Sequence, residues 1–117
     1  MSEELSAEDA KLVTLARGAR ARISSSSGAA LRDETGRTYA AADVVLPSLT
    51  LSALQLAVAQ AVASGSRGVE AAVLIVDDPL APIDATALVD LAGADTDLLV
   101  CATDGALIRR VTAGQPG

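Results

Sequence analysis

The chain has 117 residues, of which 50% are hydrophobic and 21% charged, with a formal net charge of −6 and a mean hydropathy of +0.40. This length fits one compact domain, and the excess of acidic residues argues against a partner with a phosphate backbone. The sequence contains no His and a single Cys, Cys101, so it offers no imidazole base, no internal disulfide and no thiolate zinc site.

The sequence also lacks the signals of membrane insertion and of base stacking. No apolar run approaches the roughly 18 to 20 residues that a membrane span needs. Residues 1–6 lack the basic and apolar regions of a signal peptide. Tyr39 is the only aromatic residue and cannot form a platform for nucleic-acid bases. We therefore expect a cytoplasmic protein that binds neither membranes nor nucleic acids.

The chain is expected to begin with a helix over residues 5–23. Apolar side chains recur there at helical spacing, and Ser6 and Asp9 stand three residues apart as in a capping box. The serine run 24–27 and Gly28 then end the helix. A flexible linker is the simplest interpretation of the serine run.

A hairpin and a second helix follow. The short apolar runs 29–33 and 37–41 flank the turn residues 34–36, which is typical of a β-hairpin. Pro47 and Ser48 mark the next boundary, and residues 50–64 are expected to form a helix. That helix is apolar almost all round, a pattern typical of a helix that is covered on both sides or lies in an interface.

The second half alternates strands and a short helix. Residues 69–76 form a nearly continuous apolar run, as in a strand covered on both faces. A helix over 84–92 precedes a second buried strand at 98–102, and Asp104-Gly105 turns the chain into a last strand at 107–111. Residues 113–117 are expected to fray.

The predicted order is therefore α-β-β-α-β-α-β-β. Such an order implies an α/β fold of three layers, α-β-α, around a five-stranded mixed sheet, with parallel pairing across the helical crossovers. Residues 1–112 are expected to form a single domain, followed by the tail 113–117.

Five segments stand out as landmarks in this order: Gly28-Ala-Ala-Leu31, Asp43-Val-Val-Leu46, Thr50-Leu-Ser-Ala-Leu54, Pro82-Ile-Asp-Ala-Thr86 and Val100-Cys-Ala-Thr-Asp-Gly105. With the order of elements, they resemble the small homo-oligomeric cytidine deaminases over about residues 12–111. At the matching places those proteins carry a Gly-Ala-Ala-Leu strand, Asn-Val-Glu-Asn, the helix starts Thr-Leu-Cys-Ala-Glu and Pro-Cys-x-x-Cys, and a Val-x-x-x-Asp-Gly hairpin. The resemblance implies the three-layer cytidine-deaminase-like fold, with an antiparallel fifth strand.

The resemblance also implies where zinc and the catalytic groups of the family would lie. The zinc ligands fall on Ser52, Ile83 and Thr86, and the Glu that shuttles protons falls on Leu54. Leu54 and Ile83 have no donor atom, and Ser and Thr are poor zinc ligands. Asp43 keeps one polar group at a position that holds ribose in the family. It is the single candidate for a remaining ligand contact.

These observations predict a catalytically inactive relative without zinc or another cofactor, acting as an oligomeric structural, regulatory or partner-binding module. Two alternatives stay open: a functional cytidine deaminase, which would need zinc, and an unrelated α/β module that binds small anions at helix N-termini. Self-association as a dimer or tetramer is expected, and a protein partner is possible without being identified. We also expect Leu54 and Ile83 to pack with Leu51 and Val58 and to fill the former metal site.

Two further features have simple interpretations. Cys101 lies in the middle of a predicted strand, so a small buried apolar side chain is expected rather than a reactive thiol. Asp77 and Asp78 precede a Pro in a loop, where solvated acidic residues are more common than a cation site.

Overall fold

The computed structural model describes residues 5–117. Its elements, in chain order, are α1 (Ala7–Arg22), β1 (Ser27–Asp33), β2 (Thr38–Ala42), β3 (Val44–Leu46), β4 (Leu49–Leu51), α2 (Ala53–Ala63), β5 (Val69–Val76), α3 (Thr86–Ala92), β6 (Asp97–Cys101) and β7 (Leu107–Thr112). The predicted α/β fold with a five-stranded mixed sheet is confirmed. Among the described residues, no helix is both long and apolar enough to cross a membrane.

The five-stranded sheet has the order β2-β1-β5-β6-β7. Strands β5 and β6 are parallel, and the predicted antiparallel pairing of the last strand, β7, with β6 is confirmed. Parallel pairing across the first crossover was wrong, because β1 is antiparallel to both β2 and β5. The hairpin reverses the chain before α2, so β2 is the strand that enters the crossover and β1 lies between β2 and β5.

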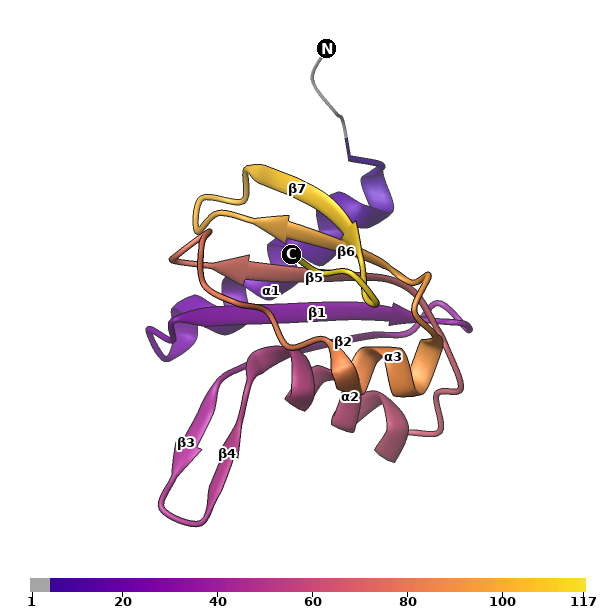
Figure 1. Cartoon of the computed structure of the whole chain (residues 1–117), viewed down its shortest axis with the longest axis horizontal. Helices are drawn as coiled ribbons and strands as arrows, with labels where there is room; N and C mark the ends of the chain where they lie inside the picture. The colour runs from indigo at the N-terminus through magenta and orange to yellow at the C-terminus, as the bar shows by residue number, and fades with distance from the viewer. Residues whose placement is uncertain (1–4) are drawn as a thin grey trace.

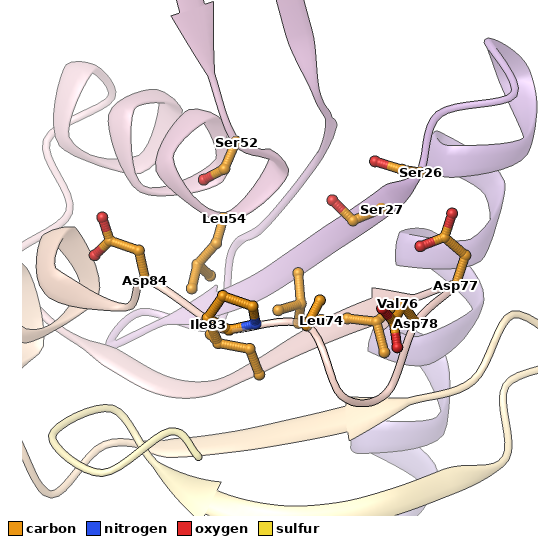
Figure 2. A pocket seen from close by; sticks show the side chains of 12 residues that line it. Ser26, Ser27, Ser52, Leu54, Leu74, Val76, Asp77, Asp78, Ile83 and Asp84 are labelled. Carbon is orange, nitrogen blue, oxygen red and sulfur yellow. The ribbon is translucent and has the colours of Figure 1, made fainter.

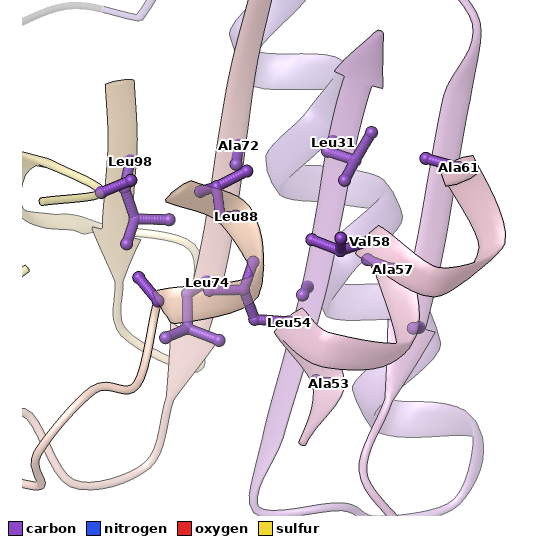
Figure 3. Packing of buried hydrophobic residues seen from close by; sticks show 14 of the residues in the cluster. Leu31, Ala53, Leu54, Ala57, Val58, Ala61, Ala72, Leu74, Leu88 and Leu98 are labelled. Atoms are coloured by element: carbon purple, nitrogen blue, oxygen red, sulfur yellow. The ribbon is translucent and has the colours of Figure 1, made fainter. Parts of the chain in front are cut away.

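Helices cover both faces of this sheet (Figure 1). Helix α1 packs on one face, and α2 and α3 pack on the other. Side chains alternate between the faces along each strand. Val73 and Ile75 of β5 join the α1 core, whereas Ala72 and Leu74 join the α2–α3 core. Figure 3 shows Leu54 and Val58 of α2 in the second core.

A separate hairpin, β3–β4, is absent from the prediction. Its strands pair in register from Val44↔Leu51 to Leu46↔Leu49, and it projects away from the body of the molecule (Figure 1). Pro47 and Ser48 are the two turn residues of this hairpin rather than a boundary between larger elements. The expected helix start at Thr50 was therefore three residues early.

Helix α2 begins directly after its N-cap residue, Ser52, which forms a capping box with Gln55. Ser52 Oγ accepts a hydrogen bond from Gln55 N at 3.1 Å, and Gln55 Oε1 accepts one from Ser52 N at 2.9 Å. This reciprocal pair satisfies two backbone donors that would otherwise lack partners. In α1, Ser6 Oγ accepts from Asp9 N at 3.1 Å, so the predicted cap at Ser6 is confirmed.

Glycine allows α1 to lie close to β1. A Cβ atom added at Gly28 would meet the carbonyl oxygen of Ala16 and would lie 2.7 Å from Cβ of Arg20. Real Cβ atoms do not approach other atoms so closely. A side chain at position 28 would therefore force the helix away from the sheet.

The C-terminal residues are docked further than expected. Ala113 is buried and its N–H donates to Thr96 O at 2.9 Å, while Gly114 N donates to Ala94 O at 2.9 Å. A β-bridge joins Thr112 and Gln115. The expectation of fraying from residue 113 was therefore wrong as far as Gln115, because this turn covers the end of the α2–α3 core.

Candidate functional site

A pocket of about 240 Å³ opens on the α2–α3 side of the sheet. It lies where β5 ends, where α2 begins and where the irregular segment 77–85 leads to α3 (Figure 2). Its lining residues are Ser26, Ser27, Ser52, Leu54, Leu74, Val76, Asp77, Asp78, Ala81, Pro82, Ile83 and Asp84. The segment 77–85 forms one side of the pocket without closing it.

The floor of the pocket is apolar. Leu54 and Leu74 are only 2% and 7% exposed, and Val76 and Ile83 are half-buried. Leu54 belongs to the first turn of α2, whereas Leu74 and Val76 occupy alternate positions of β5. These side chains offer surface for a hydrocarbon group and no atom that can bind a metal or carry a proton.

The structure brings together three of the four positions that the sequence assigned to zinc and catalysis. Ser52, Leu54 and Ile83 line the pocket, but Thr86 does not. Thr86 is exposed and lines a neighbouring depression beside Ala113. Leu54 and Val58 share a core against which Ile83 packs, yet the pocket remains beside them. The expected packing of Leu54 and Ile83 with Val58 is therefore confirmed, but these side chains leave part of the site open.

Asp43 lies behind the serines of the pocket wall and is fully engaged in hydrogen bonds within the protein. Its Oδ2 accepts from Ser25 Oγ, Ser26 Oγ and Ser27 N at 3.0, 2.8 and 3.2 Å. Its Oδ1 accepts from Ser27 Oγ and Ala53 N, both at 2.8 Å. Burial alone would raise the pKa of Asp43, but these hydrogen bonds outweigh burial and lower it.

This arrangement gives the serine run a structural role that the sequence did not predict. Instead of forming a free linker, the run is fixed to the end of β2 and to the N-terminus of α2 through Asp43. The available signal was weak, because Asp33 and Glu34 stand between the serine run and Asp43 in the sequence. Serine patterns indicate loops but do not identify the distant group that they bind.

All charged side chains that line the pocket are carboxylates. Asp78 Oδ1 accepts from Leu80 N at 2.9 Å, and Asp84 Oδ1 accepts from Thr86 N at 3.0 Å. The hydrogen bonds from Thr86 lower the pKa of Asp84. Asp77 also lines the pocket, and neither Lys nor Arg is among the lining residues.

A second engaged carboxylate, Asp33, lies outside the pocket at the other end of β1. It is fully buried and accepts from Ser66 Oγ at 2.6 Å, from Thr35 Oγ1 at 2.7 Å, and from the backbone of Thr35 and Arg37. Burial alone would raise the pKa of Asp33, but these donors hold it well below its usual range. Asp33 therefore fixes the β1–β2 turn to the loop before β5.

Cys101 lies in the core under α1 and has an unreactive thiol. It is fully buried in β6, and burial raises the pKa of its thiol to about 11. A thiol with such a pKa is protonated at neutral pH and is a weak nucleophile. The structure therefore places Cys101 as the small buried side chain that the sequence predicted.

The donor set around the pocket does not suit a transition metal. In the described part of the chain, no three His, Cys, Asp or Glu side chains are grouped so that they could hold a metal ion. Ser52 Oγ is already used as the cap of α2, and Leu54 and Ile83 have no donor atom. The residues present therefore do not fit a zinc ion.

Comparisons with known proteins agree with this architecture. The chain is similar in structure to cytidine deaminase from Burkholderia pseudomallei, with a TM-score of 0.77 and 23% identity over 89% of this chain and 91% of that one. It is similar to the cytidine deaminase of Mycobacterium leprae, with a TM-score of 0.66 and 21% identity over 89% and 92%. The Mycobacterium tuberculosis enzyme gives 0.66 and 23% over 89% of each chain. A comparison with curated proteins finds no match.

At these identities the structural similarity concerns the fold. The family assignment rests on the sequence itself, because the family described as Cytidine deaminase-like matches residues 5–105. That match includes the helix starts at Ser52 and Thr86 and four of the five strands of the large sheet, all but β7. The chain belongs to the cytidine deaminase-like family.

Proposed function

We propose that this protein is a catalytically inactive cytidine-deaminase-like protein that acts by binding, as an oligomeric structural, regulatory or partner-binding module. The chemistry at the start of α2 carries this proposal. By the resemblance, Leu54 falls at the position of the proton-shuttling Glu, and its side chain is part of an apolar core. A buried alkyl group cannot exchange protons with a substrate.

The residues that correspond to the metal ligands support the same proposal. Deamination by this family depends on water bound to zinc, which attacks C4 of cytosine. Ser52, Ile83 and Thr86 supply no thiolate and no imidazole, and Thr86 lies outside the pocket. The chain has no His, and its one Cys is buried in β6. A hydrolytic reaction therefore has neither its metal nor its base.

The test combines metal analysis with a turnover assay. Protein purified without chelators is analysed for zinc, and cytidine is followed for conversion to uridine at high enzyme concentration. An active cytidine deaminase assayed in parallel controls for the reaction conditions. We expect no stoichiometric zinc and no uridine. Bound zinc together with uridine formation would overturn the proposal.

One observation disfavours the alternative of an anion-binding module. Free N–H groups at a helix start attract anions. At α2, however, Ala53 N donates to Asp43 and Gln55 N donates to Ser52. Titration with inorganic phosphate, followed by calorimetry, is expected to give no heat of binding.

Self-association is part of the proposed function. Residues 44–66 contain no charged residue, although the whole chain carries a net charge of −6. This uncharged segment comprises β3, β4 and α2, and it exposes Val45, Leu46, Leu49 and Val62 by 78, 55, 47 and 53%. Two copies that meet through such a surface avoid most of their mutual repulsion.

Light scattering at micromolar concentration tests the association. We expect a mass of at least twice 11.7 kDa. The double variant Leu46→Asp with Val62→Asp is expected to lower the mass to that of one chain. Leu80→Asp is the matched control, because Leu80 is 91% exposed but lies outside the uncharged segment. A wild-type mass near 11.7 kDa would contradict the proposal.

A further inference from the structure

The pocket has a size and a floor that suit a ring or a short hydrocarbon group. Its volume of about 240 Å³ exceeds the roughly 150 Å³ of an engineered apolar cavity that holds benzene. Leu54, Leu74, Val76 and Ile83 supply apolar surface from three different segments. Burial of a ligand's hydrocarbon part on this floor is favourable, because it removes apolar area from water on both sides.

The charges around the pocket are negative. Asp77, Asp78 and Asp84 line it from the β5 end and from the segment that leads to α3 (Figure 2). Arg109 binds the same segment, with Nη1 donating to Pro79 O at 3.1 Å, but it is not among the lining residues. A cation in the pocket therefore finds Asp77 and Asp78 at one end and Asp84 at the other, and no lining side chain of its own sign.

The N-terminus of α2, which could otherwise attract an anion, already has a carboxylate of the protein itself next to its backbone N–H groups. Asp43 accepts from Ala53 N at 2.8 Å and thereby places a permanent negative charge at the N-terminus of α2. The hydroxyls of Ser26 and Ser27 also donate to Asp43, so they are not available as donors to an anion. A phosphate or carboxylate in the pocket would meet negative charge instead of open hydrogen-bond donors.

We infer that the pocket binds small primary amines with an apolar body. The ammonium group lies at the β5 end near Asp77 and Asp78, and the hydrocarbon part lies on the floor around Leu54 and Leu74. This inference rests on the proposed function in one respect, namely that the pocket holds no catalytic zinc. It adds the class of ligand, which the fold of the family does not specify.

A matched series of three probes tests the ligand class. Benzylamine, benzyl alcohol and benzoate share one ring and differ in charge, from positive through neutral to negative. Each is titrated into 15N-labelled protein and followed by NMR chemical-shift changes. We expect shifts at Leu54, Leu74 and Ile83, with binding of benzylamine tighter than that of benzoate by at least about tenfold, and weaker at high salt. Equal or tighter binding of benzoate, changes confined to another surface, or no change at the pocket with any probe would overturn the inference.

Charge-removing variants locate the effect. Asp77→Asn with Asp78→Asn removes two rim charges, and the amide oxygen introduced at position 78 can still accept from Leu80 N. We expect benzylamine binding to weaken by about two- to fivefold for each charge, the range typical of exposed ion pairs. Asp90→Asn is the matched control, because Asp90 is exposed on α3 and lines a different depression, between α2 and α3. The same loss in the control as in the double variant would overturn the assignment to the rim.

Cytidine, added to the same samples, separates this inference from the proposed function. Conversion of cytidine to uridine contradicts the proposal of an inactive protein, whatever the probes do. The ranking of the three probes decides the ligand class, whether or not cytidine is converted.

Discussion

The α1 face of the sheet is closed by one long helix, whereas the α2–α3 face is covered by two shorter helices and retains a pocket. Helix α1 lies directly over Gly28 and contributes Leu12 and Ala16, both with no exposed surface. On the other face, α3 has only seven residues and follows the irregular segment 77–85. Similar aliphatic side chains therefore give a sealed core on one face and leave a pocket on the other, because the elements that cover the two faces differ in length and regularity.

The largest effect is expected when a buried Leu is truncated to Ala on each face of the sheet and the losses in the free energy of unfolding are compared. Leu12 and Leu54 are 0% and 2% exposed. Leu12→Ala leaves a cavity in the sealed face and is expected to lower the free energy of unfolding by about 3 to 5 kcal/mol. Leu54→Ala merges with the existing pocket, which water can enter, so we expect a loss of about 2 to 3 kcal/mol. Urea denaturation at one fixed protein concentration measures both losses. A larger loss for Leu54→Ala would reverse the comparison.

The next largest effect on stability is expected from a side chain added at Gly28, which lies against α1. In Gly28→Ala, the new Cβ would overlap the backbone oxygen of Ala16, which cannot move without displacing α1. We expect a loss of about 3 kcal/mol, at the upper end of the usual cost of overpacking. Gly18→Ala is the control, because nothing lies within 4 Å of the added Cβ. Since Gly18 is inside a helix, that change is expected to stabilise by up to about 1 kcal/mol. Thermal unfolding that ranks the two variants in the opposite order would contradict the close approach of α1.

On the pocket face, Asp43 makes stability depend on pH. Its pKa is lowered in the folded protein, so its contribution is present above its ordinary pKa of 3.8 and is lost as the pH falls below that value. Asp43→Asn keeps one acceptor atom and is expected to cost about 1 kcal/mol at pH 7. The difference in urea midpoint between wild type and variant should shrink between pH 5 and pH 3. A difference that stays constant over this range would mean that the charge of Asp43 contributes nothing.

The smallest effect needs no substitution. Cys101 is in the α1 core, where burial raises the pKa of its thiol to about 11. At pH 8, we expect the native protein to resist labelling by iodoacetamide, whereas the urea-unfolded protein reacts at the rate of a free thiol. Rapid labelling of the native protein would show that the α1 face opens, and the contrast between the two faces would then disappear.

The sequence predicted the sheet well because its strands carry strong patterns. The apolar run Val69–Val76 is a strand with the predicted bounds, since both of its faces are covered. The β3–β4 hairpin was missed because each strand has only three residues, too few for an alternation to be recognised. The expected parallel pairing across the first crossover was wrong, because strand order along the chain does not fix which strand of a hairpin pairs with β5.

The site was predictable only in part. Ser52, Leu54 and Ile83 were located through the resemblance, since helix starts are marked by local residues such as the cap at Ser52. The five hydrogen bonds to Asp43 join residues that lie 10 to 18 positions apart. No local pattern reports such contacts. The pocket exists because the short helix α3 leaves part of this face of the sheet uncovered. That depends on three-dimensional packing, which no local sequence pattern reports.

The β3–β4 hairpin has a consequence for handling the protein in solution. Each of its strands pairs with one neighbour only, so both outer edges have backbone groups that can pair with another chain. At neutral pH, the net charge of −6 opposes aggregation beyond the proposed oligomer, but that charge vanishes near the isoelectric point of about 4.4. Because the pKa values of Asp33 and Asp43 are lowered, these two carboxylates keep their charge and their hydrogen bonds at that pH. On acidification, we therefore expect solubility to be lost before structure, so that a precipitate formed near pH 4.4 redissolves when the pH is raised.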